Sequence, residues 1–290
     1  MTDAAERSSD TCYRHPDRQS FILCQRCGRT ICPECQTPAA VGVQCPECIR
    51  DARRAASPQV RRAQRSDSRL GRILRPGGTL PLVTWTIVAI NVVVYLLQFL
   101  LGDRFTTALV FWAPLTASEP WRVVTSMFAH SPFSLSSPSS ILHILLNMYA
   151  LVLIGPMLEH LLGRARFLAL YLLAGYGGAV AVALLAPMTA VLGASGAIFG
   201  LFGAYFVLMR GLGGNPTQVL VVIALNLGIG FLVPGISWQA HVGGLVVGAG
   251  VAALYLVTRR RDRAWVRRAG LAGIAVALTA ILAVALTRIG

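Results

Sequence analysis

From Leu80 onward the chain alternates long apolar stretches with short connectors. A helix needs roughly 20 apolar residues to cross the hydrocarbon of a bilayer, and seven stretches approach that length. The segment 102–139 is too long for a simple turn, and its Trp112 and Trp121 suit a membrane–water interface. Only 13% of the residues are charged, against about 25% in soluble domains. The sequence therefore predicts an all-α polytopic membrane protein. The expected spans are 80–101, 140–161, 166–186, 193–210, 216–233, 238–257 and 269–288.

The distribution of arginine predicts the orientation of these spans. The net charge is +14, and all 26 basic residues are arginines. They gather in 50–75, in 259–268 and around the connectors 162–165 and 211–215, whereas the connectors 187–192 and 234–237 carry no charge. Cytoplasmic connectors are enriched in Arg and Lys. We therefore expect a multi-pass protein of the inner (plasma) membrane, with the N-terminus cytoplasmic and the C-terminus outside. The arginines flank spans, so nucleic acid is not an expected partner.

The seven cysteines lie together near the N-terminus. An odd number argues against a closed disulfide set, and the first 79 residues contain no long apolar run that would act as a signal peptide. In a reducing cytoplasm, four pairs of CxxC type are typical of metal ligands, and eight ligands suffice for two tetrahedral zinc ions. Sequential pairing, interleaved pairing and a single occupied site all remain open. The eight ligands are Cys12, His15, Cys24, Cys27, Cys32, Cys35, Cys45 and Cys48.

These features divide the chain into four parts. Residues 1–50 form a zinc-binding module, which we expect to bind a cytoplasmic protein partner or to act as a structural cap. Residues 51–79 are a basic flexible linker, rich in Arg, Ser, Ala and Gln, that lies near an anionic membrane face. Residues 80–257 form a six-span core, and 258–290 contain a basic inner loop and a seventh span.

Four polar residues stand out within the spans, where such groups are expensive and usually functional. With a rise of about 1.5 Å per residue, Ser195, His241 and Asn147 lie roughly 22, 27 and 25 Å from the inner arginines. His143 lies roughly 31 Å from them, at the edge of a hydrocarbon layer about 30 Å thick. Three helices thus bring polar groups to one level in the outer part of the membrane. An alternative interpretation is that these polar groups form a channel or transporter site.

The neighbours of these residues favour catalysis. Gly196, Gly200 and Gly203 follow the serine, and Gly244 and Gly248 follow the histidine, so two helices can approach closely. A serine hydroxyl becomes a nucleophile when a base lies within about 3 Å. The other histidine and the asparagine share a helix face and offer donors for an oxyanion. The only carboxylate within the spans from the second onward, Glu159, is at the inner end of its span, so the sequence predicts a Ser–His dyad.

At this point the motifs resemble those of the rhomboid family of intramembrane serine proteases. The resemblance covers about 80–257 and rests on a set of motifs in the expected order. They are Gly193-Ala194-Ser195-Gly196 with Phe199-Gly200, Ala240-His241-Val242-Gly243-Gly244, His143-Ile144-Leu145-Leu146-Asn147, and Glu119-Pro120-Trp121-Arg122.

The resemblance implies a nucleophile, Ser195, and a general base and acid, His241. It implies oxyanion donors in His143, Asn147 and the backbone N–H of the serine, with Gly193, Gly196 and Gly244 as structural parts of the motifs. Trp121 and Arg122 would hold the outer segment at the lipid interface. The fifth span, with Gly228 and Gly230, resembles the mobile element beside which substrates enter. Substrates would be membrane proteins cut in or near a transmembrane segment.

Two departures and one rival accompany this interpretation. The stretch from Ser131 to Ser140 looks like a polar addition to the outer segment, and the seventh span is found in part of the family only. The rival is a catalytically inactive rhomboid-like protein that binds or sorts membrane clients. The N-terminal module resembles a B-box-like zinc finger, which implies interleaved pairs. One ion would take Cys12, His15, Cys32 and Cys35, and the other Cys24, Cys27, Cys45 and Cys48.

Overall fold

The computed structural model describes residues 10–39, 41–55, 80–132, 140–233 and 235–289. The chain divides into two compact units, Met1–Arg65 and Ser66–Gly290, and each is described by itself. The expected linker 51–79 lies outside the described residues from 56 onward, and so do residues 133–139 of the expected polar addition.

The first unit is small and has short elements. Strand β1 (Thr11–Cys12) pairs antiparallel with β2 (His15–Gln19), and β3 (Thr37–Pro38) pairs antiparallel with β4 (Val43–Gln44). The 3-10 helix η1 (Pro33–Cys35) and helix α1 (Pro46–Ala55) complete it. Helix α1 crosses the expected boundary at residue 50, because the Arg and Ala residues that read as linker are also good helix formers. Among the described residues of this unit, the buried apolar cluster is six cysteines and Ile31.

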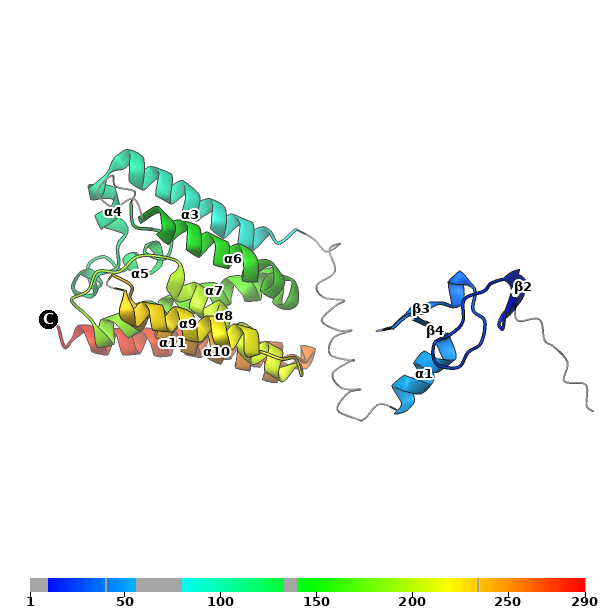
Figure 1. The fold of residues 1–290 in the computed structure, drawn as a ribbon. Helices are drawn as coiled ribbons and strands as arrows, with labels where there is room; N and C mark the ends of the chain where they lie inside the picture. Colours follow the sequence, from blue (N-terminus) through cyan, green and yellow to red (C-terminus); the bar gives the residue numbers. More distant parts are fainter. Residues whose placement is uncertain (1–9, 40, 56–79, 133–139, 234, 290) are drawn as a thin grey trace, which may run out of the picture. The chain divides into compact units, whose positions relative to one another are not determined.

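The second unit is a bundle of apolar helices (Figure 1). The prediction of an all-α polytopic membrane protein with six core spans and a seventh is confirmed, since each expected span corresponds to one helix. Within the described residues, five of these helices are long enough to cross a membrane, and α8 and α9 are shorter. The seven helices are α3 (Leu82–Leu101), α6 (Ser140–Leu162), α7 (Arg164–Leu185), α8 (Ser195–Gly211), α9 (Thr217–Leu232), α10 (Trp238–Val257) and α11 (Ala264–Leu286).

One boundary was wrong by five residues. The seventh helix begins at Ala264, after a 3-10 turn η3 (Arg261–Arg263), whereas the sequence predicted 269. Its first turns carry Arg267 and Arg268, which hydropathy assigns to a connector. Arg267 donates to the carbonyl oxygen of Thr258 (3.0 Å), so the arginine stem folds back along the helix end.

The centre of the bundle is formed by α7, α8 and α10, which pack against one another most extensively. Small residues make this possible. A side chain at Gly244 would overlap the carbonyl oxygen of Gly196, and one at Gly248 would overlap that of Gly200. Helices α8 and α10 are therefore in backbone contact, as the glycine spacing predicts. Helix α3 packs on α6, and α11 packs mainly on α7.

A buried carboxylate joins the first two spans. Glu159 of α6 is 4% exposed and accepts hydrogen bonds from the backbone N–H groups of Val83 (3.0 Å) and Thr84 (2.8 Å) and from the Thr84 hydroxyl (2.8 Å). It therefore caps the N-terminus of α3, where the first N–H groups have no intrahelical partner and the helix dipole favours an anion.

The segment between α3 and α6 contains α4 (Asp103–Leu109), η2 (Ala113–Leu115) and α5 (Arg122–Thr125). The buried guanidinium of Arg122 pairs with Glu119 and donates to the carbonyl oxygens of Thr107 and Val110, which ties α4 to α5. The neighbouring Trp121 is exposed. An isolated antiparallel bridge joins Phe111 to Val191, so this segment also holds the α7–α8 connector.

Candidate active site and metal centres

Ser195 is the first residue of α8, and the connector before it is held in place. Gly193 has φ +122°, and its N–H donates to the carbonyl oxygen of Ser126 (2.9 Å). The first N–H groups of a helix have no partner within the helix, and they form its positive end. The half-buried serine hydroxyl therefore stands beside backbone donors that suit a developing negative charge.

The second site residue, His143, borders the same connector from α6. A Cβ atom built on Gly193 would lie 2.8 Å from Nε2 of His143 and 3.8 Å from Oγ of Ser195. The imidazole of His143 and the hydroxyl of Ser195 therefore lie close together beside Gly193, where a side chain larger than hydrogen would not fit. Asn147, one turn further along α6, is buried, and its amide donates to the carbonyl oxygen of His143 (2.7 Å). A primary amide has two hydrogens, so one donor remains.

The third residue, His241, lies in the first complete turn of α10. Ser237 caps this helix by accepting from the N–H of Ala240 (3.4 Å). The imidazole is 6% exposed and stacks on the ring of Phe199, with centroids 4.1 Å apart and an interplanar angle of 9°. Phe199 follows Ser195 by four residues, so the two share a face of α8. The histidine ring therefore covers the face that carries the serine.

Packing orients His241. Among the residues that the structure describes, its Nδ1 has no hydrogen-bond partner, and no carboxylate binds the ring. A Cβ on Gly230 of α9 would lie 3.5 Å from that nitrogen. The ring is thus held between an aromatic side chain of α8 and the backbone of α9.

Two residues that sequence reasoning missed lie behind His143. Ser131 approaches Nδ1 of His143 with its backbone N–H (3.4 Å) and its hydroxyl (3.1 Å). The ring of His130 is fully buried and meets the ring of His143 edge to face, with centroids 5.1 Å apart. The contact joins the segment between α3 and α6 to α6 itself, and no periodicity marks such a pair.

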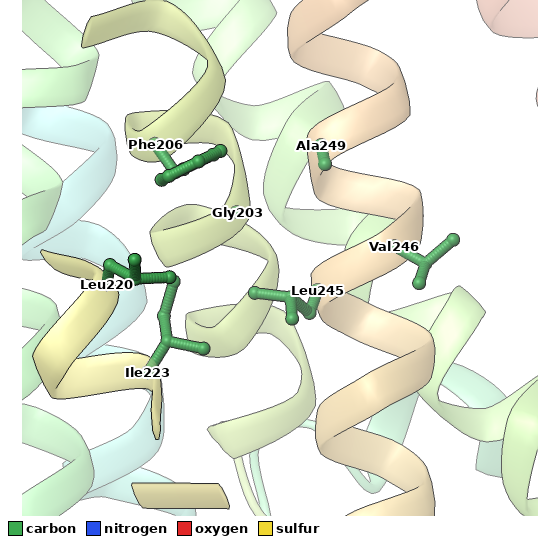
Figure 2. Close-up of a pocket in the computed structure, with 7 residues that line it drawn as sticks. All are labelled: Gly203, Phe206, Leu220, Ile223, Leu245, Val246 and Ala249. Atoms are coloured by element: carbon green, nitrogen blue, oxygen red, sulfur yellow. The ribbon is translucent and has the colours of Figure 1, made fainter. Parts of the chain in front are cut away.

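A cavity of about 240 Å³ lies elsewhere, among α8, α9 and α10. Figure 2 shows Gly203 and Phe206 on α8, Leu220 and Ile223 on α9, and the rest of the lining on α10. Gly203 is two turns, about 12 Å, along α8 from the serine. The lining contains no polar side chain, so this cavity is separate from the polar site.

The cysteine-rich unit forms two clusters of possible metal ligands. In each cluster the ligand atoms lie within 4.8 Å of one another. The clusters are Cys12, His15, Cys32 and Cys35, and Cys24, Cys27, Cys45 and Cys48. The interleaved arrangement is thus the one that the structure has, in place of the sequential alternative.

The spacing and surroundings of the sulfurs fit a tetrahedral ion. Nδ1 of His15 is 3.8 Å from the sulfur of Cys12 and 3.3 Å from that of Cys32. Zinc–sulfur bonds of about 2.3 Å place tetrahedral ligands at nearly this separation. The N–H of Cys45 donates to the sulfur of Cys24 (3.2 Å). Burial raises the pKa of the Cys24 thiol, and backbone N–H groups, that of Cys45 first, outweigh this and lower it to about 6. The pKa of one cysteine in each cluster, Cys12 and Cys24, is thus lowered toward the thiolate, which is the metal-binding form, whereas burial raises the pKa of Cys35 and Cys48.

Comparisons with known proteins agree on one family. A family model described as the Rhomboid domain matches residues 117–260. The putative rhomboid protease YdcA of Bacillus subtilis (strain 168) is 33% identical over 151 residues, which is 50% of this chain and 71% of that protein. Rhomboid protease GluP of the same organism is 33% identical over 187 residues, 60% of this chain. RHOMBOID-like protein 6, mitochondrial, of Arabidopsis thaliana is 35% identical over 141 residues, 45% of this chain. The matches span only 34% of the length of GluP and 42% of the length of RHOMBOID-like protein 6.

Proposed function

The chain belongs to the rhomboid family, and from this premise we propose that it is an intramembrane serine protease. It hydrolyses peptide bonds in or near transmembrane segments of membrane proteins, with Ser195 as nucleophile and His241 as its base. The observation that carries this proposal is the stacking of the histidine ring on Phe199, one turn from the serine, where α8 and α10 are in backbone contact.

The mechanism follows from the groups around the serine. Its hydroxyl oxygen attacks the peptide carbonyl carbon while the imidazole of His241 takes the hydroxyl proton. The carbonyl oxygen becomes an anion and accepts from the N–H of Ser195, Nε2–H of His143 and Nδ2–H of Asn147. The imidazolium then gives its proton to the leaving amine, and water hydrolyses the acyl-enzyme by the same sequence. Packing between Phe199 and α9 replaces the carboxylate that orients the base in a triad.

The lengths of the helices support a site below the outer surface. Helix α8 has 17 residues, about 26 Å, which is less than a hydrocarbon layer of about 30 Å. Its last turn carries Arg210, which suits the cytoplasmic side. The serine at the other end then lies beneath the outer face of the inner (plasma) membrane, with the N-terminus cytoplasmic and the C-terminus outside. Trp121 is exposed, as suits an interfacial anchor, and Arg122 holds the segment behind it.

Substrate segments approach beside α9. Of its 16 residues only Val219, Ile223 and Gly230 are buried, so this helix is the one held most loosely next to the site. Its displacement would open the ring of His241 toward lipid, because Gly230 covers Nδ1.

In the N-terminal module the two clusters hold two structural zinc ions. The donor sets of three thiolates with one imidazole and of four thiolates are typical of closed zinc sites, which cross-link a fold and do no chemistry. The module then serves a cytoplasmic protein partner.

The test is co-expression of the full chain with tagged single-span proteins, comparing wild type with Ser195→Ala and His241→Ala. We expect each variant to lose cleavage by on the order of 10³-fold or more, because neither group acts without the other. A fluorophosphonate probe should label wild type and Ser118→Ala, an exposed serine on the outer segment, but not Ser195→Ala. Undiminished cleavage by Ser195→Ala would refute the proposal. Client binding without cleavage or labelling would indicate an inactive family member, and solute flux in liposomes a transporter.

A further inference from the structure

The hydrogen bonds of His143 fix which of its nitrogens carries the proton. Nδ1 faces the backbone N–H of Ser131 at 3.4 Å. A backbone N–H can only donate, so Nδ1 is the acceptor and the neutral ring carries its hydrogen on Nε2. The hydroxyl of Ser131, 3.1 Å from the same nitrogen, can donate as well. Nε2 is the atom that borders Gly193 and the serine, so the hydrogen points toward the candidate oxyanion.

The peptide that carries this N–H is clamped from another helix. Gln98 of α3 is 1% exposed. Its Nε2 donates to the carbonyl oxygen of His130 (2.8 Å), and its Oε1 accepts from the N–H of His130 (3.0 Å). The same amide nitrogen also reaches the hydroxyl of Thr106 (3.2 Å), which fixes the amide orientation. Both polar groups of the residue before Ser131 are therefore bound by one side chain of the first span.

The ring of His130 holds His143 from a second direction. It is fully buried, and the two rings meet at an interplanar angle of 61°. Burial, followed by repulsion from His143, lowers the pKa of His130 to about 3, so this ring is neutral at physiological pH and adds no charge beside the donor. The imidazole of His143 is thus confined by a ring on one side and by two donors at Nδ1.

We infer that Gln98 and Ser131 are positioning residues, which hold His143 as the Nε2–H tautomer aimed at the oxyanion. The opposite tautomer would present a lone pair to a negative oxygen and would repel it. Gln98 lies outside the residues 117–260 that match the family model, so the inference links the first span of this chain to its chemistry. The catalytic consequence rests on the proposed protease function, whereas the tautomer does not.

The tautomer is measured directly by ¹⁵N NMR of the full-length protein labelled at histidine, in micelles, with His143→Gln to assign the signals. We expect the unprotonated nitrogen of His143 to be Nδ1 at neutral pH. A proton on Nδ1 would overturn the inference, whether or not the protein cleaves a substrate. Conversely, if the wild-type protein has the expected tautomer but cleaves no substrate, the proposed protease function is refuted and the inference about the tautomer stands.

Kinetics test the role of each group. Ser131→Ala removes one of two donors to Nδ1, and we expect kcat to fall about 3- to 10-fold with KM unchanged, as the loss of one hydrogen bond implies. Ser131→Thr keeps the hydroxyl and should restore kcat. Gln98→Met removes the clamp and should lower kcat further while populating the other tautomer in the spectrum. Ser118→Ala is the control. The inference is wrong if Ser131→Ala has the same kcat as that control. It is also wrong if the fall in kcat is explained by a lowered melting temperature of the variant.

Discussion

At Gly193 the chain has room for hydrogen only, and this sets the first prediction. An alanine there would place its Cβ 2.8 Å from Nε2 of His143. The backbone at this position has φ +122°, a conformation that residues with a side chain rarely adopt. We expect Gly193→Ala to push the imidazole away and to lower cleavage by about 100-fold or more, with a stability loss of about 1–3 kcal/mol.

The measurements are substrate cleavage, fluorophosphonate labelling and thermal unfolding in detergent. Gly273→Ala in α11 is the control, because a Cβ there meets nothing within 4 Å. Wild-type cleavage by Gly193→Ala would show that His143 does not act from this position.

The residues around the site differ in how far the sequence could predict them. Ser195, His241 and Asn147 could be found because polar groups in apolar spans are few and their depths coincide. Ser131 and His130 could not, because they lie in a polar segment where such residues are ordinary. Their contacts with α6 are tertiary contacts, which no spacing rule describes. Phe199 was found as part of a motif, but its stacking on His241 was not predictable, since any apolar side chain satisfies the pattern.

Among the elements, the contact between α8 and α10 carries the geometry of the proposed dyad. A methyl group at Gly244 would overlap the carbonyl oxygen of Gly196, which adjoins the serine. We expect Gly244→Ala to separate the two helices, to destabilise the protein by about 1–3 kcal/mol and to abolish cleavage. A Cβ built on Gly250 of the same helix has no atom within 4 Å, so we expect Gly250→Ala to leave the stability of the protein unchanged or to raise it slightly.

The pair of variants is compared by thermal unfolding and by the kcat of a common substrate. Equal behaviour of Gly244→Ala and Gly250→Ala would mean that backbone contact between α8 and α10 is not required for the site.

The elements themselves were largely predictable from hydropathy, since seven apolar stretches became seven helices. What hydropathy could not predict were the ends. The seventh helix extends into arginines whose long stems lie along the helix, and α1 continues into what read as linker. The role of Glu159 was also missed, because a lone carboxylate near an inner end reads as a solvated group. In the structure it is buried as the cap of α3, and its partners lie 75 and 76 residues away in the sequence.

At the scale of the whole molecule, the two units differ in what holds them together. The membrane unit buries a continuous apolar core, whereas the described residues of the first unit bury six cysteines and Ile31. Units of this size rarely fold on so small a core without cross-links. Structural zinc contributes on the order of 10–16 kcal/mol to such folds, far more than one buried isoleucine, so we expect a bound metal to decide whether this unit folds.

We therefore expect the purified chain to contain two zinc ions, and His15→Ala to contain about one, because that residue belongs to a single cluster. Stripping the metal with a strong chelator should expose the cysteine-rich unit to protease and thiol reagents, since thiolates without a metal cannot bridge its strands. Substrate cleavage should remain within about two-fold, because Ser195, His241 and their supports belong to the other unit. Zinc content, protease resistance of the first unit and cleavage rate are measured on one sample by metal analysis, limited proteolysis and kinetics. Mock-treated protein is the control. A first unit that stays resistant without metal would contradict its dependence on zinc, and a loss of cleavage on chelation would mean that the two units are coupled.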